Sequence, residues 1–146
     1  MKKGKTICID FDGVIATYNG FKGSDVIGDP INGAKDATKT LKEEGYTIII
    51  FTTRKAEDIK EWLKTNGITY DYINENPNQP KQTNMGKPIA DLYLDDRAIC
   101  FRGNWEWALR DIVYFEPYNK PDQKKEFEKI FDDYRKYSSK KQSESL

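Results

Sequence analysis

The chain has 146 residues, of which 24 are lysine or arginine and 24 are aspartate or glutamate, so its formal net charge is zero. A chain of this length can bury one hydrophobic core, and a balanced charge provides no overall field that attracts nucleic acid or an anionic membrane. Histidine is absent, which excludes Ser-His-Asp and Cys-His catalytic systems and every metal site with an imidazole ligand. Any catalysis must therefore use carboxylates, hydroxyls, lysines and a hard cation.

The cysteines and the apolar runs indicate the compartment. Cys8 and Cys100 each lie in an apolar stretch, which favours reduced, packed thiols over a disulfide framework. The initial segment MKKGK is basic, but no apolar region of signal-peptide length follows it, and no apolar run has the length of a membrane span. We therefore expect a cytoplasmic protein without a membrane partner.

The first predicted strand ends in two carboxylates. An apolar run from Ile7 to Ile9 precedes Asp10 and Asp12, and Gly13 then allows the backbone to turn away. Ligands of open α/β sheets bind outside the carboxyl ends of the strands, so this is where a site would lie. Two aspartates at this position also commonly cap or solvate a turn, and the pair alone leaves both interpretations open.

The next segments predict a loop and a helix. Residues 15–28 are rich in glycine and polar side chains, which is typical of an ordered loop or a short hairpin. A helix is expected to start near Asp29-Pro30 or Asn32 and to stop at Gly45. Its buried face is marked at helical spacing by Ala34, Ala37 and Leu41.

A second strand and a second helix follow. Residues 46–51 are β-branched or aromatic, which predicts a strand covered on both faces, and Thr52, Thr53 and Arg54 come directly after it. Residues 56–67 predict a helix that closes on a glycine. Its apolar residues at three- and four-residue spacing are Ile59, Trp62 and Leu63.

The remaining chain predicts three more strands and two helices. Strands are expected over residues 68–73, 90–94 and 112–115, and the segment 74–88, with three prolines, reads as a long irregular connection. Asn104 can cap a short helix that carries Trp105, Ala108 and Leu109.

The carboxyl-terminal part predicts an amphipathic helix over residues 121–137 and a disordered tail over residues 138–146. The apolar stripe of this helix would pack on its own domain or on a second copy of the chain, as a homo-oligomer. Its members are Phe127, Ile130, Phe131 and Tyr134.

Strands that alternate with helices predict a single α/β domain over residues 1–137, of Rossmann-like type, with about five parallel strands and helices on both faces. The carboxyl ends of such strands share one edge, so the polar residues 10–12, 52–54 and 95–96 are expected to converge there. Crowded carboxylates take up protons or share a cation, and oxygen ligands suit Mg²⁺ with a substrate phosphate. The sequence thus predicts a magnesium phosphate site.

Three ordered motifs resemble those of the haloacid dehalogenase (HAD) superfamily: DFDGV its first, IIIFTT its second and LYLDD its acidic fourth. The resemblance spans residues 6–115 and implies a HAD-type phosphatase without a large cap domain, which uses Mg²⁺ and an aspartyl-phosphate. By this resemblance Asp10 would be the nucleophile and a metal ligand. Asp12 would be the general acid and base and would offer its carbonyl to the metal. Thr52 would bind the phosphoryl group, and Asp95, with Asp96, would complete the metal site.

The Thr-Thr-Arg and Asp-Asp-Arg runs resemble more narrowly the 3'-phosphatase domain of bacteriophage polynucleotide kinase and small stand-alone relatives. Arg54 would then contact substrate phosphate, which Gly13 and Thr53 would also help to bind; the alternative for this arginine is a surface salt bridge at a helix start. The charge-balancing lysine would be Lys87, as in the small relatives, or Lys81.

Geometry separates these two lysines. Lys87 lies eight residues before Asp95, and an extended chain of that length would span about 26 Å, which puts Lys87 at the wrong end of the strand unless the chain turns at Pro88. Lys81 belongs to a loop that begins at the carboxyl edge. We prefer Lys87 and keep Lys81 as the geometric alternative.

The expected substrate is a phosphorylated small molecule, a nucleotide or a nucleic-acid end, because no cap closes the site. Four aromatic residues could stack on a base, although such residues more often pack in a core, namely Tyr18, Phe21, Trp105 and Trp107. A catalytically idle phosphate-binding or regulatory module on the same fold is the alternative of another class, and a protein phosphatase is an alternative enzyme.

Overall fold

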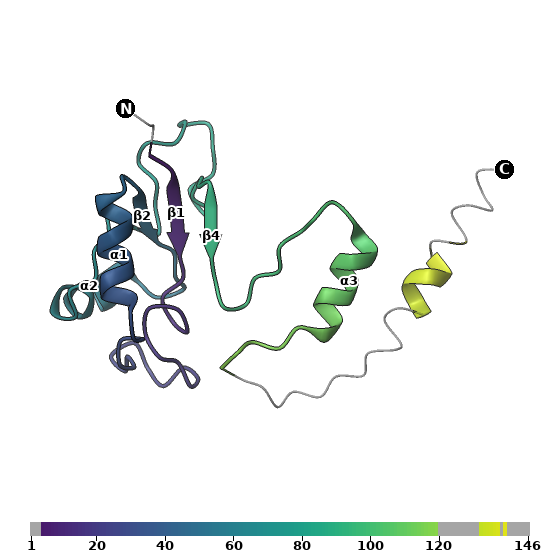
Figure 1. Ribbon diagram of the computed structural model, residues 1–146, viewed down its shortest axis with the longest axis horizontal. Helices are drawn as coiled ribbons and strands as arrows, with labels where there is room; N and C mark the ends of the chain where they lie inside the picture. Colours follow the sequence, from purple (N-terminus) through teal and green to yellow (C-terminus); the bar gives the residue numbers. More distant parts are fainter. Residues whose placement is uncertain (1–3, 120–131, 138, 140–146) are drawn as a thin grey trace. The chain divides into compact units, whose positions relative to one another are not determined.

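The computed structural model describes residues 4–119, 132–137 and 139 of the chain, which divides into two compact units, Met1–Asp96 and Arg97–Leu146. The first unit holds a four-stranded sheet and two helices (Figure 1). These elements are β1 (Thr6–Ile9), α1 (Ala34–Glu43), β2 (Thr47–Ile50), α2 (Ala56–Thr65), β3 (Tyr72–Ile73) and β4 (Leu92–Leu94). The single domain over residues 1–137 stays a prediction.

All neighbouring strands are parallel, and their spatial order is β3-β2-β1-β4. The predicted α/β class with a parallel sheet is therefore confirmed, with four strands among the described residues in place of the expected five. The chain moves from β1 to β2 and β3 on one side, and it returns past β1 to add β4 on the other. The order thus reverses beside β1, and such a switch point is where ligands bind in open α/β sheets.

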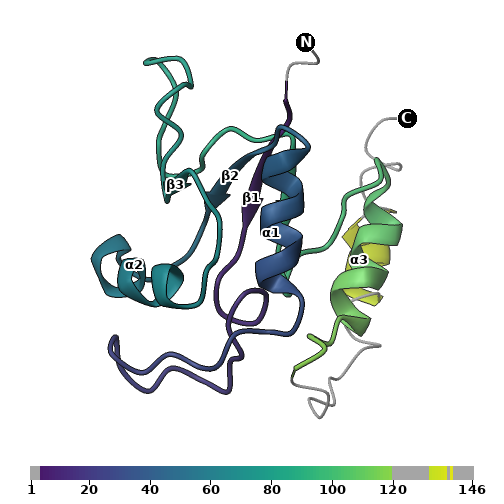
Figure 2. The ribbon, with the colours of Figure 1, turned by 60° about the vertical axis from the view of Figure 1, so that its left-hand side comes forward.

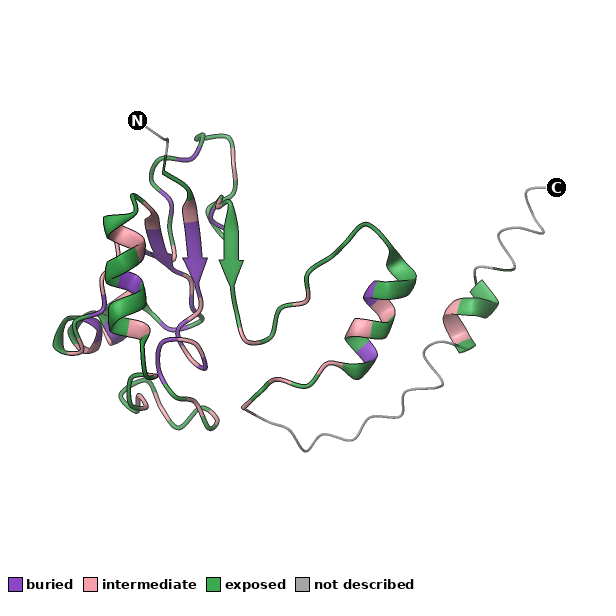
Figure 3. Ribbon diagram, in the orientation of Figure 1, coloured by how far each residue is buried: buried purple, intermediate pink, exposed green. Residues whose placement is uncertain are grey.

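The sheet buries an isoleucine-rich core. Ile7 and Ile9 of β1 lie opposite Ile48 and Ile50 of β2, and all four are buried in one cluster. Both helices pack against this cluster, through Leu41 of α1 and through the buried Ile59 and Leu63 of α2. Figure 3 shows burial concentrated in β1 and β2, whereas β4 is exposed.

Both helices of the first unit lie on one face of its sheet, so helices on both faces stay a prediction. The side chains of a strand alternate between the two faces, so the four core isoleucines share one face, and α1 and α2 cover that same face. Cys8 and Ile49 point the other way and are also buried, and no helix of residues 4–96 is left to cover them. The physical reason is that two successive right-handed crossovers in one direction place both helices on one side.

The two cysteines differ in environment. Both are free thiols, as expected, but only Cys8 is buried, and burial raises the pKa of its thiol to about 11. Cys100 is exposed, so the prediction of a packed thiol is wrong at that position.

Helix α1 begins at Ala34 with Gly33 as its N-cap, which agrees with the expected start near Asn32 and not with a start at Asp29-Pro30. Asp29 and Pro30 are not at a helix start because this stretch pairs with the segment that follows β1: Thr17 N donates to Asp29 O at 2.8 Å, and Ala16 forms an antiparallel bridge with Pro30. This pairing closes the predicted 15–28 loop at its base, and residues 15–28 contain no strand. Ala34 and Leu41 pack against the core as expected, but the fully buried residue of α1 is Thr38, and Ala37 is exposed.

Helix α2 forms over the expected residues and ends before Gly67, whose φ of 67° is in the left-handed region. The third and fourth strands are shorter than predicted, because residues 68–71 and residues 90–91 do not have strand geometry. The irregular connection between β3 and β4 is confirmed, and Figures 1 and 2 show that it reaches the amino-terminal end of the strands.

The predicted fifth strand is wrong, because residues 112–114 belong to helix α3 (Trp105–Tyr114) of the second unit. Asn104 caps this helix as expected, with its side-chain oxygen accepting from Trp107 N at 3.0 Å. Once the cap has started the helix, two β-branched residues near its end do not interrupt it, because their intrinsic preference is small. Ala108 and Val113 are its buried residues.

Residues 132–137 are helical, in agreement with the expected carboxyl-terminal helix. Phe127, Ile130 and Phe131 of its apolar stripe lie outside the described residues, as does all of the tail except Ser139. Association of two copies through this stripe therefore stays a prediction. Among the described residues, no helix combines the length and the apolar character that crossing a membrane requires.

Candidate functional site

Three carboxylates meet at the carboxyl edge of the sheet. Asp10 directly follows β1, and Asp95 and Asp96 follow β4, whose Leu94 lies opposite Ile9. A hydrogen bond from Asp10 N to Leu94 O, 2.9 Å long, continues the strand pairing to the end of β4. Side-chain oxygens of the three aspartates consequently lie within 4.8 Å of one another, which confirms the predicted convergence of these two acidic motifs.

This crowding affects the protonation of Asp10. The pKa of the Asp10 carboxyl rises from 3.8 to about 7. Burial is the largest cause, a backbone hydrogen bond at Phe11 opposes the rise, and the charges of Asp95 and Asp96 and a hydrogen bond with Asp96 add to it. The buried Oδ2 atom of Asp96 has no hydrogen-bond partner among the described residues. A proton or a cation would relieve both the repulsion and the unsatisfied oxygen.

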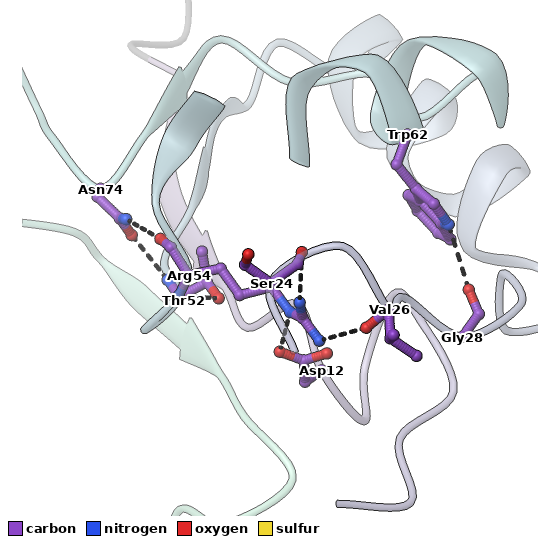
Figure 4. A network of polar contacts seen from close by, with 8 residues as sticks. All are labelled: Asp12, Ser24, Val26, Gly28, Thr52, Arg54, Trp62 and Asn74. Atoms are coloured by element: carbon purple, nitrogen blue, oxygen red, sulfur yellow. Dashed lines mark hydrogen bonds and ion pairs between the residues drawn. The ribbon is translucent and has the colours of Figure 1, made fainter. Parts of the chain in front are cut away.

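A second group of residues surrounds Asp12 (Figure 4). The Arg54 Nε atom donates to Asp12 Oδ2 at 2.7 Å, and its two terminal nitrogens donate to Ser24 O at 3.3 Å and Val26 O at 3.1 Å. Only 7% of Arg54 is exposed, so the expected alternative of a surface salt bridge is wrong. The guanidinium instead joins the end of β2 to the loop that follows β1.

Asp12 retains one uncommitted carboxylate oxygen. Its Oδ1 atom is buried and has no hydrogen-bond partner among the described residues. A buried oxygen without a partner costs free energy, and such atoms in folded proteins often mark a place for water, an ion or a substrate. The two aspartates of the first motif therefore have different surroundings: Asp10 faces other carboxylates, whereas Asp12 faces a cation.

Thr52 is held by a residue that the sequence analysis missed. Asn74 follows β3, and its side chain accepts from Thr52 N at 2.7 Å and donates to Arg54 O at 3.0 Å. Thr52 is buried, and its hydroxyl accepts from Arg54 N at 3.1 Å. Asn74 has a φ of 58°. An asparagine directly after a predicted strand is the signal that was available, because asparagine tolerates this conformation better than other side chains.

Gly13 and Thr53 also lie at this edge. Gly13 has a φ of 91° and donates to Ala16 O at 2.8 Å, so the predicted backbone turn after the carboxylates is confirmed. Thr53 is exposed. Their contribution to phosphate binding stays a prediction.

Both candidate lysines lie elsewhere. The Lys87 ammonium lies 5.1 Å from the centre of the Tyr93 ring, and the Tyr93 hydroxyl donates to the carbonyl of the buried Pro88 at 2.6 Å. Lys81 lies between Gln79 and Thr83, and Gln79 accepts from Ile89 N at 3.0 Å. These bonds place the loop near the amino end of β4. The structure thus does not bring either lysine together with the acidic motifs, and the phosphate role of a lysine stays a prediction.

A cavity of about 330 Å³ opens beside Asp12. Phe21 and Tyr18 from the loop after β1 form part of its wall, and its polar lining includes Thr53, Lys55 and Asp58. Two of the four candidate stacking residues therefore lie at this cavity. The other two, Trp105 and Trp107, are exposed residues of α3 in the second unit.

Comparison with models of known protein families finds no match, and comparison with curated proteins finds none either. Among solved structures, the chain is similar to a conserved protein from Bacteroides thetaiotaomicron, with a TM-score of 0.56 and 25% sequence identity. The similarity covers 83% of this chain and 99% of that protein, which is described only as conserved. It supports the α/β fold and carries no statement about activity.

Proposed function

We propose that this protein is a Mg²⁺-dependent phosphatase of the HAD type, which hydrolyses phosphomonoesters through an aspartyl-phosphate on Asp10. The observation that carries the proposal is the gathering of Asp10, Asp95 and Asp96 within 4.8 Å at the carboxyl edge, beside the switch point between β1 and β4. The ordered motifs DFDGV, IIIFTT and LYLDD support it independently.

The residues fit a magnesium ion. Asp10, Asp95 and Asp96 would hold it, since their donor atoms are all carboxylate oxygens and one of these, Oδ2 of Asp96, is buried without a hydrogen-bond partner among the described residues. The ion would neutralise charge on the phosphoryl oxygens. Its binding would also keep Asp10 deprotonated, as a nucleophile must be.

Asp10 and Asp12 then divide the chemistry. The Asp10 carboxylate attacks phosphorus, the bond from phosphorus to the ester oxygen breaks, and the leaving oxygen takes a proton from Asp12. In the second step Asp12 takes a proton from water, whose oxygen attacks phosphorus and releases phosphate from Asp10. Oδ2 of Asp12 is bonded to Arg54, so the proton would move at Oδ1, the oxygen without a described partner.

Thr52 and Arg54 support these steps in different ways. The Thr52 hydroxyl would bind a phosphoryl oxygen, and Asn74 holds the Thr52 backbone in place. Arg54 already donates to a carboxylate and two carbonyls. A direct contact between Arg54 and phosphate would require one of these bonds to break, so the geometry favours a positioning role for this side chain.

The deciding experiment is the turnover of an aryl phosphate with Mg²⁺ by the wild-type protein and by Asp10→Asn. We expect Asp10→Asn to lose activity by about 10³-fold or more, since removal of a nucleophile usually has this effect, while circular dichroism shows an intact fold. Asp36→Asn, which changes an aspartate in the first turn of α1, is the matched control and should retain activity. Turnover by Asp10→Asn close to that of the wild type would contradict the proposal.

A screen of nucleotides, sugar phosphates, phosphorylated DNA ends and phosphopeptides would identify the substrate class. Absence of turnover across that panel with Mg²⁺ present would favour the catalytically idle phosphate-binding or regulatory module. Exclusive turnover of phosphopeptides would instead identify a protein phosphatase.

A further inference from the structure

We propose that the cavity beside Asp12 binds an aromatic ring in the leaving group of the substrate, with Phe21 as the stacking surface. The inference rests on the proposed function and extends it, because it states which phosphomonoesters the site prefers. Substrates that carry a planar ring in the leaving group are expected to react faster than matched substrates without one.

The position of the cavity follows from the role of Asp12. A general acid must lie within hydrogen-bond reach of the leaving oxygen, so the remainder of the leaving group must occupy the space next to that acid. Asp12 lines the cavity of about 330 Å³, and Thr53, which follows the candidate phosphate-binding Thr52, lines it too. The leaving group would therefore enter this cavity.

Phe21 presents an aromatic surface to this space. Phe21 is 68% exposed, and the Arg54 guanidinium carbon lies over its ring, 5.8 Å from the ring centre. Exposure of one phenylalanine is common on protein surfaces and would mean little by itself. Here the exposed ring lies at the wall of a cavity that also contains the candidate acid.

The loop that carries Phe21 is anchored at several points. Arg54 donates to the carbonyls of Ser24 and Val26, and the indole of Trp62 donates to Gly28 O at 3.2 Å (Figure 4). The Trp62 ring in turn packs edge-on against the buried Phe11, with 5.0 Å between ring centres. A ring on an anchored loop loses little conformational freedom when a ligand binds, which favours affinity.

The remaining lining suits a heteroaromatic ring. Lys55 and Asp58 place one cation and one carboxylate at the cavity, so a donor and an acceptor are available to polar ring edges. The volume is at the lower end of the range for small-molecule sites, about 300 to 1,000 Å³. Both a benzyl group and a nucleoside supply an aromatic ring to the leaving group, and the experiment distinguishes these two sources of the ring.

The test compares kcat/KM within two substrate pairs that have similar ester oxygens. Benzyl phosphate against cyclohexylmethyl phosphate tests a simple ring, and adenosine 5'-monophosphate against ribose 5-phosphate tests a nucleobase. We expect the wild-type protein with Mg²⁺ to prefer the aromatic member of at least one pair by about tenfold, the usual scale of one stacked ring.

Variants at Phe21 assign the preference to this ring. Phe21→Ala should abolish it and Phe21→Trp should retain it, while Met85→Ala, which removes an exposed apolar side chain from the β3–β4 connection, should leave it unchanged. Equal kcat/KM values within both pairs for the wild type, or a preference that survives in Phe21→Ala, would overturn the inference and leave the proposed phosphatase intact.

Absence of turnover for all four substrates would contradict the proposed function, and calorimetry with the wild-type protein would then decide the inference. Binding of adenosine 5'-monophosphate about tenfold tighter than ribose 5-phosphate, with the difference lost in Phe21→Ala, would support an aromatic site. Equal affinities in the wild type would overturn it.

Discussion

Arg54 Nε lies 2.7 Å from Asp12 Oδ2, and the two side chains are only 5% and 17% exposed. The same guanidinium donates to Ser24 and Val26 in the loop after β1. One side chain thereby holds both the candidate acid and the loop that borders the cavity, so changes at Arg54 should affect stability as well as turnover.

Arg54→Ala should lower the free energy of unfolding by about 3 kcal/mol, because it leaves the mostly buried Asp12 carboxylate without its cation. Arg54→Lys should recover only part of this loss, since one ammonium cannot reproduce donors that point in three directions. Urea denaturation measures both values. Lys39→Ala, which breaks an exposed pair with Glu43 (68% and 64% exposed), is the control and should cost less than about 1 kcal/mol. A similar small loss for Arg54→Ala would show that the buried pair contributes little.

Asn74 should influence turnover by holding the Thr52 backbone in position, without contacting the substrate itself. Asn74→Gly removes the bonds to Thr52 N and Arg54 O but accommodates the φ of 58°, whereas Asn74→Ala adds the strain of a left-handed conformation, about 1 kcal/mol. We therefore expect both variants to have reduced kcat/KM, with Asn74→Ala the less stable of the two by this amount. Urea denaturation and phosphatase kinetics are the measurements. Equal stabilities would argue against strain at this position, and unchanged kinetics would argue against a positioning role.

The stability of the metal-free protein should depend on the ionisation of Asp10. Burial, chiefly, and the neighbouring Asp95 and Asp96 together raise the pKa of this carboxyl from 3.8 to about 7, so the folded chain holds the proton more tightly than the unfolded chain. This contribution to stability is complete below 3.8 and is lost as the pH rises through about 7. In EDTA, the melting temperature of Asp10→Asn minus that of the wild type should therefore become more positive from about pH 5 to about pH 8.

Magnesium should stabilise the wild-type protein more strongly as the pH rises, opposite to the loss of stability that the ionisation of Asp10 causes without metal. Because Mg²⁺ binds the deprotonated carboxylate, the increase in melting temperature that it causes should grow as the pH rises through the same range. Asp10→Asn should show little of this increase at any pH. If the difference in melting temperature between the wild type and Asp10→Asn in EDTA stayed constant over this pH range, Asp10 would not titrate there.

Local patterns in the sequence were sufficient to predict the sheet and its acidic edge. The apolar runs that become β1 and β2 end directly before Asp10 and Thr52, and parallel strands bring their carboxyl ends to one edge. The meeting of Asp10 with Asp95 and Asp96 follows from this rule and is confirmed. The predicted fifth strand failed because the Asn104 cap starts a helix that continues through Val113.

The side-chain partners at the site were decided by tertiary structure. Arg54 bonds to residues that lie 42, 30 and 28 positions away in the chain, and Asn76 and Gln79 fold the β3–β4 connection back to Ile89, away from the edge where a lysine was expected. Apolar periodicity is a local property, so the sequence by itself determined which segments form the sheet and where the carboxylates emerge. Which cation faces Asp12, and which ring borders its cavity, depends on how the loop between β1 and α1 closes over the end of β2, and only the folded chain brings those residues together.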